Sequence, residues 1–131
     1  MFILFHIILM ALGILCIITG VSAAVFFRRK RYWLKVHKSF NSISGILLSA
    51  GATMAITAIW QQKGDHLDGF HPVTGSIALG FTFVSLFLGF YQFKAGNRRQ
   101  VFKTFHRWLG RLSVLLIIAA LISGLVRAGI I

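Results

Sequence analysis

Four apolar runs dominate the chain, and most polar residues lie in the short segments between them. The runs cover residues 2–27, 39–60, 72–93 and 108–126. Each run is close to the roughly 20 residues that a helix needs to cross a bilayer core. None contains Asp, Glu or Lys, and Arg111 is the one charged residue inside them. The pattern predicts an all-α integral membrane protein, an up-down-up-down four-helix bundle.

We expect a single domain, 1–131, whose helices cover about residues 2–27, 37–61, 71–94 and 105–127. The first run is followed by four basic residues rather than a cleavage site, so we interpret it as a retained span and not a signal peptide. Cys16 is the single cysteine, which excludes a disulfide within the chain.

Each expected helix carries one histidine near its start: His6, His37, His71 and His106. Steps of four and three residues from each histidine follow one helix face that is rich in Gly, Ala, Ser and Thr. In membranes, such small-residue faces are where helices approach one another. All four histidines are therefore expected to point into the bundle.

Charge predicts the orientation of the chain. There are 14 basic residues and only 2 acidic ones, with a net charge of +12. Twelve basic residues lie in or beside the first and third loops, whereas Lys63 and Arg127 lie on the other side with Asp65 and Asp68. Basic loops favour the cytoplasm, so both termini are expected to be extracytoplasmic, in a plasma membrane or a bacterial inner membrane.

The same charge pattern argues against two other classes of protein. The basic residues are explained by membrane topology, so no nucleic-acid partner is expected. A four-helix drug exporter would need a carboxylate inside the membrane, and no apolar run contains one.

Depth sorts the histidines into two pairs. His6 and His71 start helices on the outer side (the outer pair), and His37 and His106 start helices on the inner side (the inner pair). Neutral imidazole is a common metal ligand, and haem iron accepts two axial ligands. Zinc suits two facing histidines less well, because its tetrahedral site would be half empty. The sequence predicts two bis-histidine haem sites, roughly 20 Å apart at 1.5 Å per helical residue.

The recurring glycines fit this prediction, because a flat porphyrin needs room between helices. Gly75 and Gly110 lie one turn from their own histidines, and four more lie at the level of the opposite site: Gly20, Gly51, Gly89 and Gly124. Candidate contacts for the anionic haem propionates are Lys38, Arg107 and Arg111 at the inner site, and Lys63 and Arg127 at the outer site. His66, between Asp65 and Asp68, is interpreted as part of a solvated turn, with a weak cation or ferric site as the alternative.

Three segments resemble the cytochrome b561 and ferric-reductase transmembrane family: FFRRKRYWLKVHK, HPVTGSIALGFTFVSLFLGFYQFKAGNRR and FHRWLGRLSVLLIIAALISGL. The resemblance follows the four central helices of the family, and the chain is smaller than the six-helix members. It implies two b-type haems, held by His6 with His71 and by His37 with His106. It also implies electron transfer from ascorbate in the cytoplasm to monodehydroascorbate or ferric iron outside.

The expected function is therefore transmembrane electron transfer from a cytoplasmic, ascorbate-like donor to an extracytoplasmic acceptor. Whether this makes the chain a ferric or monodehydroascorbate reductase stays open. Two alternatives remain: a quinol-linked di-haem anchor that passes electrons to a partner subunit, and a haem-free membrane scaffold. Expected partners are membrane lipid, a small-molecule donor and acceptor, and either a second copy of the chain or a redox partner subunit.

Overall fold

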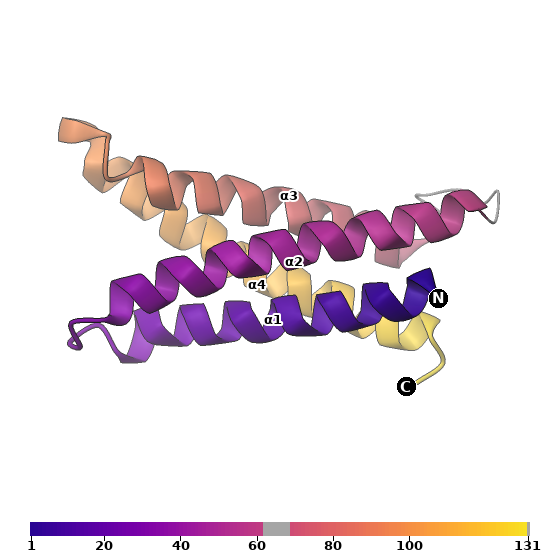
Figure 1. Ribbon diagram of the computed structural model, residues 1–131. Coiled ribbons are helices and arrows are strands. Elements are labelled where there is room, and N and C mark those ends of the chain that lie inside the picture. Colours follow the sequence, from indigo (N-terminus) through magenta and orange to yellow (C-terminus); the bar gives the residue numbers. More distant parts are fainter. Residues whose placement is uncertain (62–68, 131) are drawn as a thin grey trace. The chain divides into compact units, whose positions relative to one another are not determined.

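A computed structural model describes residues 1–61 and 69–130 (Figure 1). The helices are α1 (Phe2–Phe26), α2 (Trp33–Gln61), α3 (Phe70–Tyr91) and α4 (Arg99–Arg127), with a 3-10 turn, η1 (Gly96–Arg98), before α4. Each of the four α-helices is long and apolar enough to cross a membrane. The predicted all-α class with four membrane-length helices is confirmed. The prediction for Lys63, Asp65, His66 and Asp68 lies outside the described residues.

The chain divides into two compact units, Met1–His66 and Leu67–Ile131. The first unit contains α1 packed along α2, and the second contains α3 packed along α4 (Figure 1). Each unit is a helical hairpin, called the first and the second hairpin below.

Small residues bring α1 and α2 close together in the first hairpin. Ser44 is fully buried on α2 and donates a hydrogen bond to the carbonyl oxygen of Gly13 on α1, at 2.8 Å. A Cβ atom added to Gly13 would lie 2.8 Å from a methyl carbon of Leu48, which is too close. Gly13 therefore permits this approach, as glycine does at many membrane helix interfaces.

The second hairpin buries the faces predicted from the histidine spacing. The buried residues of α3 are Thr74, Ala78, Thr82 and Ser85, and those of α4 are Ser113, Ile117 and Ala120. The buried Thr82 and Ser113 hydroxyls each bond a carbonyl one turn earlier in their own helix, at 2.8 Å. These polar side chains thus add no unsatisfied group to an apolar environment.

Three helix ends differ by more than one residue from the predicted ones. α2 begins at Trp33 and α4 at Arg99, both earlier than expected, and α3 ends at Tyr91, earlier than residue 94. Hydropathy marks only the apolar part of a helix, whereas Arg, Lys and Gln are good helix formers outside the bilayer. Gly96, at φ +50°, adopts a conformation that glycine tolerates and so turns the chain between α3 and α4.

Candidate functional site

Both histidines of the first hairpin are hydrogen-bonded to the backbone of the facing helix. His6 Nδ1 lies 2.9 Å from the carbonyl oxygen of Gly51, and His37 Nδ1 lies 2.9 Å from that of Gly20. A carbonyl oxygen only accepts hydrogen bonds, so Nδ1 must carry the proton. The lone pair of each neutral imidazole is then on Nε2.

The second hairpin repeats this arrangement. His71 Nδ1 lies 2.9 Å from the carbonyl oxygen of Ala120, and His106 Nδ1 lies 2.8 Å from that of Ser85. All four histidines are half-buried and share the same tautomer by the same argument. Each hairpin therefore orients one histidine at each of its ends through its own two helices.

Two glycines of the second hairpin lie directly against the histidine rings. A Cβ atom on Gly124 would lie 2.9 Å from Cε1 of His71, and one on Gly89 would lie 2.9 Å from Cε1 of His106. Real Cβ atoms essentially never approach so closely, so these glycines make room for the imidazoles of the facing helix. Their predicted role beside a porphyrin stays a prediction.

The other four predicted glycines have different surroundings. Gly20 lies against the Asn41 amide and Gly51 against Met10. A Cβ atom on Gly110 would lie 3.3 Å from Ser85 Oγ. Among the described residues, nothing lies within 4 Å of a Cβ atom placed on Gly75, so the space beside it is open.

Three polar side chains approach the Nδ1 atoms of the histidines. Asn41 Nδ2 lies 3.1 Å from His37 Nδ1, Ser123 Oγ lies 3.3 Å from His71 Nδ1, and Ser85 Oγ lies 3.4 Å from His106 Nδ1. No residue type or spacing in the sequence marks these residues as partners of the histidines. Asn41 and Ser85 do lie on the small-residue faces that contain the histidines. That shared face is the only feature of the sequence that places them near a histidine.

A pocket of about 530 Å³ opens beside His71 in the second hairpin. Its lining residues are Gly69, Phe70, His71, Ser123, Val126 and Arg127. Gly69 precedes α3 at φ +92°, which an L-residue rarely adopts, and a Cβ atom added there would lie 3.4 Å from Arg127 Nη1. The pocket thus combines open volume, an oriented imidazole and a cation.

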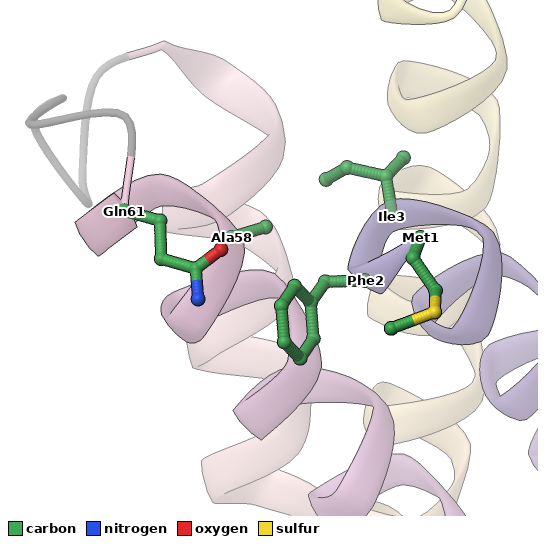
Figure 2. Close-up of a pocket in the computed structure, with 5 residues that line it drawn as sticks. All are labelled: Met1, Phe2, Ile3, Ala58 and Gln61. Carbon is green, nitrogen blue, oxygen red and sulfur yellow. The ribbon is translucent and has the colours of Figure 1, made fainter.

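A smaller pocket lies in the first hairpin, where the start of α1 meets the end of α2 (Figure 2). It has a volume of about 130 Å³, and its lining residues are Met1, Phe2, Ile3, Ala58 and Gln61. None of these residues is a predicted ligand, so we do not assign it to the site.

Basic and aromatic side chains lie near the inner pair. The Arg28 guanidinium lies 5.9 Å from the centre of the Trp33 ring, which in turn lies 6.3 Å from the centre of the His37 ring. Arg111 lies 5.2 Å from the centre of the Trp108 ring. Of the predicted propionate contacts at this site, Arg107 and Arg111 are exposed and Lys38 is half-buried.

The histidines suit a metal that accepts neutral nitrogen ligands. A ligating histidine usually donates its other ring N–H to a carbonyl or carboxylate, which fixes its tautomer and raises its basicity. All four Nδ1 atoms have such a carbonyl partner. In the described part of the chain, no three His, Cys, Asp or Glu side chains gather around one point. The donor chemistry therefore fits axial ligation of haem iron.

Comparison with known families decides the class of the protein. A family model described as eukaryotic cytochrome b561 matches residues 1–130. The chain belongs to the cytochrome b561 family. As a member, it is an integral multi-pass membrane protein that carries out haem-based transmembrane electron transfer. Its partners are membrane lipid and small redox molecules. Searches of curated proteins and of solved structures gave no match.

Proposed function

We propose that this member of the cytochrome b561 family binds two haem b groups, each held by one histidine from each hairpin. His6 and His71 would hold the outer haem, and His37 and His106 the inner haem. The observation that carries this proposal is that all four histidines make the same kind of hydrogen bond, from Nδ1 to a backbone carbonyl of the facing helix. When bound, haem supplies a reversible one-electron oxidation and reduction at its iron.

The backbone carbonyls orient the histidine imidazoles and increase the electron density at Nε2, the atom that would bind iron. A carbonyl that accepts a hydrogen bond from Nδ1 stops rotation of the imidazole and increases the basicity of Nε2. Because the carbonyls belong to helices of the same hairpin, each histidine is oriented before a ligand arrives. Such preorganisation lowers the cost of binding.

Basic side chains would pair with the anionic haem propionates. Arg127 suits the outer haem because it lines the same pocket as His71. Lys38, Arg107 and Arg111 are the candidates at the inner haem. An arginine can bind a carboxylate through two parallel hydrogen bonds, which makes it a strong partner in this role.

The proposed direction of electron transfer is from the cytoplasm outwards. Twelve basic residues lie in or beside the two loops assigned to the cytoplasm. Their summed field would concentrate an anionic donor such as ascorbate near the inner haem. The acceptor on the other side would be ferric iron or monodehydroascorbate.

Side-specific reduction tests this function. The purified protein would be reconstituted in liposomes with ferric iron trapped inside, and sidedness measured by protease access to the loops. Ascorbate added at the basic face should reduce the trapped iron, and ascorbate at the opposite face should not. Rapid reduction by a quinol, with none by ascorbate from either side, would instead support the quinol-linked anchor.

A further inference from the structure

Asn41 contacts the inner ligand His37 in two ways. Its amide nitrogen donates to the backbone carbonyl of His37 at 2.6 Å and lies 3.1 Å from Nδ1 of the same residue. The contact with the carbonyl identifies the atom as the NH₂ group, since a carbonyl only accepts. The positive end of the amide dipole therefore faces the His37 imidazole.

The position of this amide is fixed from the facing helix. Gly20 supplies the carbonyl that accepts from His37 Nδ1, and a Cβ atom on Gly20 would collide with the Asn41 amide. Gly20 therefore accepts the hydrogen bond of the imidazole and, because it has no side chain, leaves room for the amide. Asn41 is half-buried in a membrane-spanning helix, where a polar side chain is by default a candidate for function.

The amide opposes the effect of the Gly20 carbonyl. The carbonyl increases the electron density at Nε2 through the Nδ1 hydrogen bond. A positive N–H group close to Nδ1 withdraws density from the same ring. Asn41 thereby makes Nε2 a weaker donor.

We propose that Asn41 is a positioning residue that raises the midpoint potential of the inner haem by weakening His37 as an electron donor. This inference rests on the proposed ligation by His37 and His106. A weaker donor stabilises ferric iron less and so favours the reduced form. At His71 and His106 the corresponding neighbours are the hydroxyls of Ser123 and Ser85, which can also accept a hydrogen bond from Nδ1.

The test is a potentiometric titration of the purified holoprotein and its Asn41→Ala variant. In the variant, the reduction equilibrium constant of the inner haem should fall about threefold to tenfold, tenfold being about 59 mV for one electron. The outer haem, titrated in the same sample, should keep its potential. Ser49→Ala is the matched control, because Ser49 bonds a carbonyl of its own helix, Gly45, at 2.6 Å. This control substitution should leave the midpoint potentials of both haems unchanged.

Asn41→Ser separates tuning from helix packing. The serine hydroxyl can still bond the His37 carbonyl, but the amide next to Nδ1 is gone, so the inner potential should again fall. Unchanged or raised inner potentials in both variants, with normal haem content, would overturn the inference. So would loss of the inner haem in both variants, because Asn41 would then be needed only for structure.

The failure of the proposed ligation would look different. It would appear in the unmodified protein as an absence of haem, or as a spectrum without bis-imidazole signals in electron paramagnetic resonance. That result would remove the basis of the inference as well. A normal spectrum with no effect of Asn41 would leave the ligation intact.

Discussion

His71 on α3 donates from Nδ1 to the carbonyl oxygen of Ala120 on α4, at 2.9 Å, and the ring lies directly against Gly124. One helix therefore supplies the imidazole, while the other supplies both its hydrogen-bond acceptor and the space it occupies. The orientation of each histidine is therefore a property of a helix pair and not of one helix alone.

Replacing His71 with Ala should remove the outer haem and leave the inner haem bound. The two proposed pairs share no ligand, and His37 and His106 keep their own carbonyl partners at Gly20 and Ser85. Haem content per chain should fall by half in a pyridine haemochrome assay. Loss of both haems would contradict the independence of the sites.

The Gly124→Ala substitution should weaken the outer haem without touching a ligand. Its new Cβ atom would lie 2.9 Å from Cε1 of His71, so the ring or the facing helix must shift. Overpacking of this kind costs about 1–3 kcal/mol, and about 1.4 kcal/mol is tenfold in affinity. Haem titration of the apoprotein would measure the loss.

Gly80→Ala is the control for this substitution. Gly80 lies on α3, and nothing in the described part of the chain lies within 4 Å of a Cβ atom placed there. This variant should bind both haems normally. Equal affinity in the Gly124 and Gly80 variants would mean that the ring contact does not control binding.

The Gly75→Leu substitution tests whether open space beside a ligand is needed for the cofactor. The described residues leave the position of a Cβ atom on Gly75 unobstructed, so the hairpin itself should tolerate a larger side chain. If a porphyrin passes there, leucine should displace the outer haem while helix content by circular dichroism stays normal. Full haem content in this variant would show that no porphyrin passes beside Gly75.

The basic loops should make reduction by ascorbate sensitive to salt. Screening shortens the Debye length from about 30 Å at 0.01 M to about 10 Å at 0.1 M, which weakens the attraction of an anionic donor. The initial rate should fall as salt rises, and fall further when Arg28, Arg29, Lys30 and Arg31 are replaced with Gln. A neutral quinol, as the control, should respond much less to either change.

If these charges only set topology and bind lipid headgroups, the ascorbate rate will not respond to their removal. That outcome, with haem content unchanged, would contradict the proposed donor.

The sequence was sufficient to predict the helices and the faces they bury. Runs of apolar residues are broken by charged loops, and Gly, Ser and Thr at helical spacing mark the faces that pack, as Ser44, Thr82 and Ser113 confirm. Helix ends were harder, because charged residues such as Arg99 extend a helix into water without changing its hydropathy.

The hydrogen-bond partners of the histidines could not be predicted. The acceptors are backbone carbonyls, which every residue has, so no residue type marks Gly20 or Ala120 as a partner. Asn41 and His37 lie one turn apart on α2, but the 3.1 Å separation of Asn41 Nδ2 from His37 Nδ1 could not be predicted either. A spacing rule gives the face on which a residue lies, but it does not give such distances.

The most direct test of the central claim is the number of haems per chain in the purified protein, from pyridine haemochrome absorbance and quantitative amino-acid analysis. Four histidines with the same tautomer, two in each hairpin, predict two haem b groups per chain with bis-imidazole spectra. A ratio of one would mean that one histidine pair is structural. A folded preparation without haem would contradict the account as a whole.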